Sequence, residues 1–300
     1  MKLSNINNPV FKDLLNLNLV DKNDLRLFLN KTRDSNIKSY IDLNSKIIFL
    51  EKYNRNKNYY IKKKTNRKFS LKRSVSSLKF KDKNILSKNL DDDHRRFIQF
   101  KRLIKNKSIL DFGCGKGGFI KMCQNISKQS YALEVNDDYV KELKKDLTIK
   151  KNLKDFNKTK FDIITIFHVL EHLPNQIEVI KSLLKKLKTN GKLIIEVPSA
   201  HDFLFKVKGL NSFKNFTMWS EHLILHTSES LKKFCENAGA KKIKIKYFQR
   251  YNFSNHYGWI VDNLPGGHEK HNFSRIINTE YQRHLEKKKE SDTLIAILQK

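Results

Sequence analysis

Three features are scarce or missing in this chain of 300 residues, and each absence excludes a class of protein. The apolar runs are short, and none approaches the roughly 20 residues that a membrane-spanning helix needs. The opening residues MKLSN lead into no apolar segment, so we expect no secretory signal. The only cysteines are Cys114, Cys123 and Cys235, an odd number without metal-ligand spacing. This pattern fits a reducing compartment, so we expect a cytoplasmic protein with no transmembrane segment.

Acidic residues are also scarce relative to basic ones. The chain has 61 Lys and Arg against 31 Asp and Glu, which gives a formal net charge of +30. Such a charge suits a nucleic-acid partner, and it is most concentrated in residues 51–90. A run such as Lys62 to Lys64 is more often a solvated face, and coding bias toward Lys and Asn explains the rest. A nucleic-acid partner therefore stays open but is not favoured.

Glycine is rare, yet four of the ten glycines fall within residues 113–118. They follow a predicted strand, Ser108 to Asp111, and precede a predicted helix. A loop without Cβ atoms passes close under a ligand, and the backbone N–H groups at the start of a helix remain free. Glu134 ends the next predicted strand, where a carboxylate accepts hydrogen bonds from ribose hydroxyls. The combination predicts a site for an adenosine-bearing ligand.

Strands and helices alternate from Ser108 onward, which predicts an α/β fold. We expect a doubly wound, Rossmann-like and mostly parallel sheet with an antiparallel last strand, formed by residues 89–300. Residues 1–88 are expected to form a small accessory region with short helices up to Leu29, a hairpin within residues 39–50, and a basic linker. Two long connections, at about 200–227 and 250–290, are expected to face the substrate.

The chain resembles the class I S-adenosylmethionine-dependent methyltransferases. The segment from Ile109 to Gly117 is similar to their glycine-rich motif I, and Glu134 matches the ribose-binding acid. Residues 161–174 and 187–198 resemble the two following motifs of a broad bacterial family that includes ubiquinone-type O-methyltransferases and polysaccharide-locus methyltransferases. The resemblance implies S-adenosylmethionine as cofactor. It implies as cofactor-binding residues Asp111, Gly113, Gly115, Gly117, Glu134, Asp155, Phe167 and His168.

The chemistry is expected at the end of the strand that closes at Phe167. His168, Glu171 and His172 follow it, at the edge where open parallel sheets carry their ligands. An imidazole there can act as a general base, although Glu171 and His172 can equally cap a helix start. Some relatives carry Glu-x-x-Glu-His at this place and bind a divalent ion. Here His168 replaces the first carboxylate, so a metal held by His168, Glu171 and His172 is only a weak alternative.

The two long connections supply the remaining candidates. His222 is predicted to be a base beside His172 and His168, and Glu221 precedes it in a segment expected to face the acceptor. The connection after Gln249 is polar and aromatic, which suits a ring-bearing acceptor such as a sugar. The residues expected to contact the substrate are Glu221, Arg250, Tyr251, Asn255, His256 and His268.

We therefore predict methyl transfer to a small-molecule or glycan acceptor, with a sugar or sugar nucleotide of surface-polysaccharide synthesis as the leading choice. One alternative is an RNA or DNA methyltransferase that uses the basic segment 52–88. Phe167 and the residues after it lack the Pro-Pro-aromatic tetrad that many amino-group methylating nucleic-acid enzymes carry. The other alternative is a non-catalytic module that binds cofactor or docks partners, and the intact glycine loop argues against it. No oligomeric state follows from the sequence.

Overall fold

The computed structural model describes residues 6–54, 59–62 and 92–300. These residues form two compact units. The first unit holds residues up to 54 together with 168–182 and 195–298, and the second holds 59–62, 92–167 and 183–194. In the described parts of the chain, no helix is both long and apolar enough to cross a membrane. The expected boundary between an accessory region and the catalytic domain near residue 88 stays a prediction. The first unit groups the N-terminal residues with residues 168–182 and 195–298.

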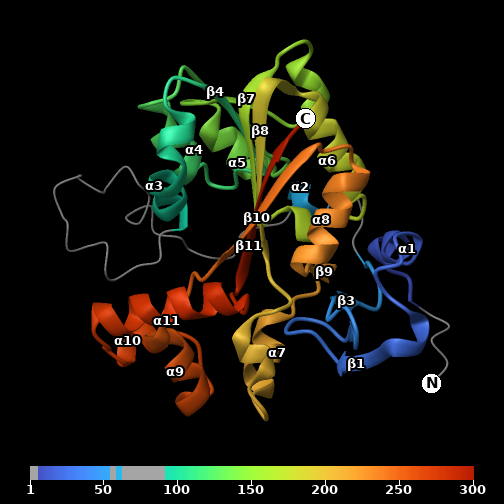
Figure 1. Cartoon of the computed structure of the whole chain (residues 1–300). Helices are drawn as coiled ribbons and strands as arrows, with labels where there is room; N and C mark the ends of the chain where they lie inside the picture. Colours follow the sequence, from blue (N-terminus) through green and yellow to red (C-terminus); the bar gives the residue numbers. More distant parts are fainter. Residues whose placement is uncertain (1–5, 55–58, 63–91) are drawn as a thin grey trace. The chain divides into compact units, whose positions relative to one another are not determined.

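A seven-stranded sheet is the largest element of the fold (Figure 1). The strands around the cofactor motif pair in parallel. In this pairing, Asp111 is opposite Ala132 on one neighbouring strand and Thr165 on the other. The expected fold class, a doubly wound and mostly parallel sheet with an antiparallel last strand, is confirmed. The strands in sheet order are β10 Lys242–Phe248, β11 Thr293–Gln299, β8 Leu187–Pro198, β7 Phe161–Phe167, β4 Ser108–Phe112, β5 Gln129–Leu133 and β6 Thr148–Lys150.

Acidic side chains and a side-chain cap begin two helices of this α/β region. Asp92 and Asp93 lie in the first turn of α3, where acidic side chains favour the helix dipole. Asn136 caps α5 by accepting hydrogen bonds from the backbone N–H groups of Asp138 and Tyr139. The helices are α2 Tyr59–Lys62, α3 Asp92–Ile104, α4 Gly118–Gln124, α5 Asp137–Leu143, α6 Gln176–Lys185 and α8 Ser228–Asn237.

The N-terminal residues form helix α1 (Pro9–Asn16) and a small antiparallel sheet of order β1-β2-β3-β9. The predicted hairpin is confirmed as β2 (Ser39–Asp42) and β3 (Ile48–Leu50). The predicted helix near Leu25–Leu29 is wrong, because this segment is strand β1 and pairs with β2. The fourth strand, β9 (Ile224–Leu225), pairs with β3, which ties the N-terminal residues to the segment after β8. The basic linker lies largely outside the described residues.

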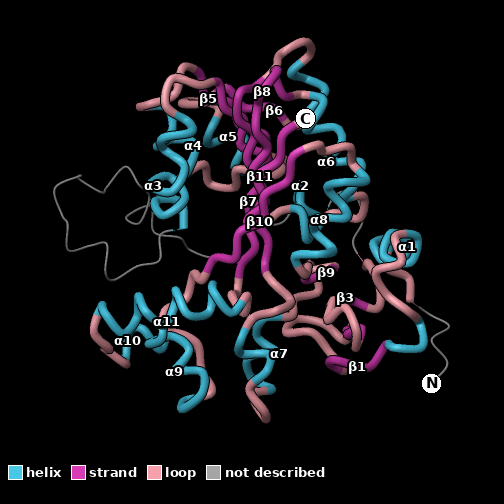
Figure 2. Tube along the Cα trace, in the orientation of Figure 1, coloured by secondary structure: helices cyan, strands magenta, loops and turns pink. Residues whose placement is uncertain are grey.

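The connection between β10 and β11 folds into three helices, which Figure 2 shows as a separate cyan group. They are α9 (Phe253–Asp262), α10 (Gly267–Lys270) and α11 (Arg275–Lys288). Two glycines allow α9 and α10 to touch. A Cβ added to Gly267 would lie 2.5 Å from the Ser254 carbonyl oxygen, and one added to Gly258 would lie 2.5 Å from the Gly267 Cα. Gly267 is therefore needed here because two backbone segments approach each other closely.

We predict that Gly267→Ala destabilises the chain. The added methyl group would collide with backbone, which cannot swing aside as a side chain can, so we expect a loss of about 1–3 kcal/mol in the free energy of unfolding. Urea denaturation of both proteins measures it. Glu269→Ala, an exposed change in the same helix, is the matched control and should leave the midpoint unchanged. Equal midpoints for wild type and Gly267→Ala would show that the helices are not in this contact.

Candidate active site

The glycine loop lies between β4 and α4 in the second unit. Gly113, Gly115 and Gly117 all have positive φ angles, of 74°, 54° and 72°, which a residue with a side chain rarely adopts. A Cβ added to Gly115 would meet no atom within 4 Å, so the loop leaves open space at this residue. A Cβ on Gly117 would instead lie 2.8 Å from a methyl group of Leu143. The loop is therefore open at Gly115 and packed at Gly117.

Glu134 directly follows β5, and its carboxylate holds the glycine loop. Oε2 accepts a hydrogen bond from the Gly115 N–H at 2.8 Å, and Oε1 accepts from Val135 and Asn136 N–H at 2.8 and 2.9 Å. A carboxylate offers about four lone-pair sites, and three of them are used here. The remaining site on Oε2 is available to a hydroxyl donor next to the open side of Gly115. The fit to a ribose hydroxyl is good.

Asp111, another predicted cofactor-binding residue, lies on β4 just before the glycine loop. It is 4% exposed, and its Oδ1 accepts a hydrogen bond of 2.7 Å from the Thr165 hydroxyl on β7. Burial raises the pKa of Asp111 to about 7, although the bond from Thr165 opposes this shift. The geometry thus shows Asp111 cross-linking two strands under the motif.

Phe167 and Asp155, also predicted to bind the cofactor, occupy different surroundings. Phe167 is 8% exposed, and the centroid of its ring lies 5.1 Å from the centroid of the Phe119 ring. The guanidinium carbon of Arg96 lies 4.8 Å from the centroid of the Phe167 ring. Asp155 is exposed on the short helix Leu153–Phe156 that follows β6. Their contacts to a cofactor stay predictions.

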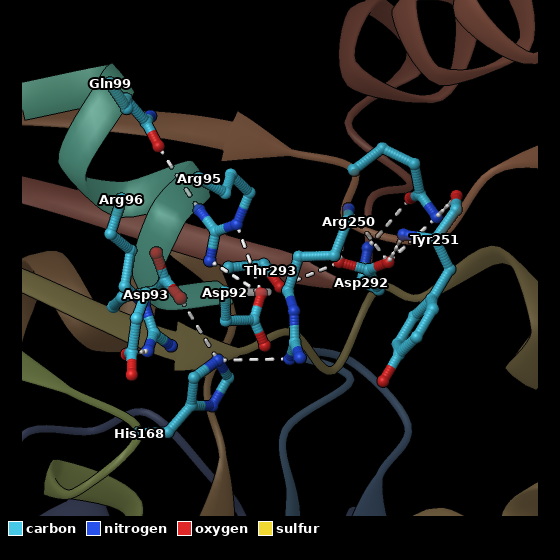
Figure 3. Close-up of polar contacts among 12 residues, drawn as sticks. Asp92, Asp93, Arg95, Arg96, Gln99, His168, Arg250, Tyr251, Asp292 and Thr293 are labelled. Atoms are coloured by element: carbon cyan, nitrogen blue, oxygen red, sulfur yellow. Dashed lines mark hydrogen bonds and ion pairs between the residues drawn. The ribbon is translucent and has the colours of Figure 1, made fainter. Parts of the chain in front are cut away.

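His168 follows Phe167 and lies in the first unit, with a left-handed φ of 52°. Arg250 Nη1 donates to His168 Nε2 at 3.1 Å, a contact drawn in Figure 3. Nδ1 lies 3.2 Å from Glu171 Oε1, and Nε2 lies 3.3 Å from Glu196 Oε1. Burial lowers the pKa of His168, but its bonds to the two carboxylates outweigh burial and raise the pKa. Both ring nitrogens are engaged, so the structure favours a positioning role for His168.

Glu171, His172 and His222 form the cluster that stands out chemically. One ligand atom from each lies within 4.8 Å of the others. Burial raises the pKa of the Glu171 carboxyl, yet the neighbouring histidines outweigh it and lower this pKa to about 2. Burial and His172 lower the pKa of His222 to about 4. At neutral pH the cluster therefore holds one carboxylate anion and an uncharged His222.

Two polar atoms of this cluster are buried without a hydrogen-bond partner, namely Glu171 Oε2 and His222 Nδ1. His172 Nδ1 donates to the Glu221 carbonyl oxygen at 2.9 Å, because a carbonyl only accepts. Buried polar atoms without partners cost about 1–3 kcal/mol each, so such atoms at a site are expected to serve a ligand. The weak metal alternative changes accordingly, with His222 in the place of His168.

The predicted substrate residues of the insertion differ in their contacts and in their burial. Arg250 reaches His168, and the backbone N–H groups of Arg250 and Tyr251 donate to Asp292 (Figure 3). Asn255 and His256 are 4% and 1% exposed. His256 contacts Tyr281 and Gln249 through its two ring nitrogens, which favours a structural role, and the predicted substrate contact of these residues stays untested. Asn255 lies 3.4 Å from His268 Nδ1 through its side-chain nitrogen.

Two acidic residues of this site were not identified from the sequence. The Asp292 carboxylate accepts five hydrogen bonds, and three of them come from the backbone N–H groups of Arg250 and Tyr251 at the start of the insertion. Glu196 lies near the end of β8, after an apolar stretch, and contacts His168. For Glu196, the sequence offered one signal, a single acidic residue within an apolar stretch. Asp292 precedes the last strand and belongs to no recognisable motif.

Comparison with known proteins decides the family. The model of the methyltransferase domain family matches residues 84–245, more than half of the chain. This chain belongs to the methyltransferase domain family. A curated relative, a ubiquinone biosynthesis O-methyltransferase of Coxiella burnetii, is 24% identical over 168 residues, which are 50% of this chain and 70% of that protein.

Solved structures of similar proteins include two from archaea. An S-adenosylmethionine-dependent methyltransferase of Archaeoglobus fulgidus is 22% identical, with a TM-score of 0.48 over 71% of this chain and 95% of that one. A methyltransferase of Haloferax volcanii in complex with the Trm112 activator is 12% identical, with a TM-score of 0.49 over 72% and 93% of the two chains.

S-adenosylmethionine is the cofactor of this methyltransferase, and the second unit fits it. The residues that would hold it are those of the open loop around Gly115, together with Glu134, whose free lone pair can accept a hydroxyl. Cys114 needs no part in this, since burial raises the pKa of its thiol far above neutral.

We predict that Glu134→Ala weakens the binding of S-adenosylmethionine by roughly 1–3 kcal/mol, because it removes an acceptor and leaves the Gly115 N–H unpaired. Isothermal titration calorimetry measures the affinity. Asp138→Ala, an exposed acid four residues later, is the control and should bind as the wild type does. If both variants bind equally well, Glu134 does not contact the cofactor.

Proposed function

We propose that this methyltransferase transfers a methyl group to a hydroxyl of a small-molecule or glycan acceptor, with a sugar or sugar nucleotide of surface-polysaccharide synthesis as the leading candidate. The observation that carries the proposal is the cluster of Glu171, His172 and His222. It offers two buried polar atoms without a hydrogen-bond partner, Glu171 Oε2 and His222 Nδ1. A hydroxyl is a donor that satisfies such an atom while its oxygen lone pairs remain available for attack.

The chemistry required of the chain is modest. S-adenosylmethionine supplies an electrophilic methyl group when it is bound. The part left to the chain would be to orient the acceptor hydroxyl toward that methyl group and to take up the proton of the hydroxyl. His222 is uncharged and has a free Nδ1, so it can accept this proton. The Glu171 carboxylate beside it would stabilise the imidazolium that forms.

Polar groups around the cluster support a hydrophilic acceptor. Arg250 projects to His168 and stacks its guanidinium 5.1 Å from the Tyr251 ring centroid. The guanidinium offers several N–H donors in a plane, which suits the hydroxyl groups of a sugar. The curated relative named for O-methyl transfer supports oxygen as the methylated atom.

A second candidate gives the same cluster a different role, in which Glu171, His172 and His222 hold a divalent cation. One carboxylate and two imidazoles are common ligands of transition metals. The bond from His172 Nδ1 to a carbonyl oxygen orients its Nε2, as is usual for metal-bound histidine. The cation would then bind the acceptor hydroxyl and favour loss of its proton.

The nucleic-acid alternative depends on the segment 52–88, which lies largely outside the described residues. No contact within the described residues favours it.

We predict that His222→Ala lowers the turnover by about 10²–10⁴-fold, the usual contribution of a positioned base, while the affinity for S-adenosylmethionine stays near that of the wild type. Turnover is followed by mass spectrometry of nucleotide sugars and cell extract incubated with labelled cofactor. His284→Ala changes an exposed histidine of α11 and is the control. Unchanged turnover in His222→Ala would exclude both roles of the cluster.

A chelator separates the two roles. If a cation is bound, EDTA abolishes turnover, added Mn²⁺ or Mg²⁺ restores it, and Glu171→Gln loses both activity and metal binding. If His222 acts as a base alone, EDTA has no effect. Metal content of the purified protein, measured by plasma emission spectrometry, provides a readout that does not depend on the acceptor.

A further inference from the structure

A cavity of about 330 Å³ lies in the first unit and is lined by none of the histidines described above. Its walls come from three parts of the chain, namely residues 31–33 after β1, one side of α7 (Asn211–Thr217), and residues 259–265 at the end of α9. The volume lies in the range of small-molecule sites, about 300–1,000 Å³. The part of the chain that the structure describes places no acidic residue in its lining.

Arg33 is a cation of this cavity that packs against two aromatic rings. Its guanidinium carbon lies 4.1 Å from the Phe216 ring centroid and 4.3 Å from the Trp219 ring centroid. Its backbone N–H donates to the Met218 carbonyl oxygen at 2.8 Å. Two aromatic rings thus hold the guanidinium by cation–π contact, which leaves its N–H edges free to donate. Among the described residues, no carboxylate pairs with Arg33 or with Lys31 beside it.

Residues of α7 and of the end of α9 supply aromatic and amide groups to the lining of the cavity. The Phe216 and Trp259 rings lie 4.9 Å apart between centroids, and Ser212 Oγ donates to Asn263 Oδ1 at 3.0 Å, which joins α7 to the end of α9. Aromatic surface with amide donors is suited to the apolar face and hydroxyls of a sugar ring. Arg33 and Lys31, in a lining that holds no acidic residue, are suited to a phosphate.

One short segment connects the cavity with the candidate base. Phe216 lines the cavity, and His222 lies six residues later, with its N–H donating to the Trp219 carbonyl oxygen at 3.1 Å. Asp34 accepts from the backbone and hydroxyl of Ser220, which ties this segment to the Arg33 side. Six extended residues span at most about 20 Å, so an elongated acceptor can reach from the cavity to the histidines.

We propose that this cavity binds the phosphate-bearing part of the acceptor, with Arg33 as the residue that binds the phosphate. The acceptor class is then a sugar phosphate, either free or as part of a nucleotide sugar. This inference rests on the proposed function, which it narrows from polar acceptors in general to anionic ones.

Calorimetry on the full chain tests the proposal with four probes: glucose, glucose 1-phosphate, UDP-glucose and inorganic phosphate. We expect glucose 1-phosphate or UDP-glucose to bind at least tenfold more tightly than glucose and than phosphate alone, and the stronger of the two identifies the free or nucleotide-linked source. Arg33→Gln should weaken this binding at least tenfold. Arg275→Gln, an exposed arginine of α11 outside the cavity, is the charge-matched control and should bind normally. Thermal denaturation checks that both variants fold.

The proposal is overturned by no binding of either phosphorylated probe, by equal binding of glucose, or by equal weakening in the two arginine variants. Binding of phosphate alone as tightly as the sugar phosphates would reduce the cavity to an anion site and also overturns it. In turnover assays with the bound probe, Arg33→Gln should raise KM and leave kcat unchanged. Methylation of an uncharged acceptor that ignores Arg33 would leave the proposed function standing without this cavity, whereas Arg33-dependent binding without methyl transfer would do the reverse.

Discussion

The buried carboxylate of Glu171 is the constraint around which His168, His172 and His222 are arranged. Its side chain is fully buried, and an isolated carboxylate in such a place would be protonated or would destabilise the fold. His168 donates to one of its oxygens, and His172 and His222 lie nearby, so the pKa is lowered despite burial. The anion in turn requires these three side chains to stay close. The backbone carbonyl of Glu171 accepts the Leu223 N–H at 2.9 Å, which places the His222 segment beside it.

A second buried carboxylate, Asp292, fixes the position of the groups around it at the start of the insertion. It accepts hydrogen bonds from the backbone of Arg250 and Tyr251 and from the side chains of Gln249 and Thr293. These bonds hold the point where the chain leaves β10 for the three-helix insertion. The Arg250 side chain, directed from this point to His168, therefore links the insertion to the Glu171 cluster.

The cofactor side follows a different principle, since it is made almost wholly of backbone. Gly115 is left open, and Glu134 holds its N–H and two more N–H groups in a fixed array. Such an array depends on local sequence, because only glycine adopts the required positive φ angles easily. The Glu171 cluster instead depends on side chains from segments far apart in the sequence.

This difference explains what the sequence alone determined. The strand, glycine loop, helix and acid that follow one another from Ser108 to Glu134 identified the fold class, the family and the cofactor, because each is a local pattern with a local physical cause. The pairing of β9 with β3 joins residues more than 170 positions apart, and no local signal marks it. Likewise, His222 was identified as a candidate, but only the tertiary structure put it beside Glu171 and left Nδ1 unpaired. The cavity at Arg33 depends on the same kind of long-range packing. Burial and pairing of polar groups are properties of the folded chain, so only the tertiary structure decided which of these residues are available to a ligand.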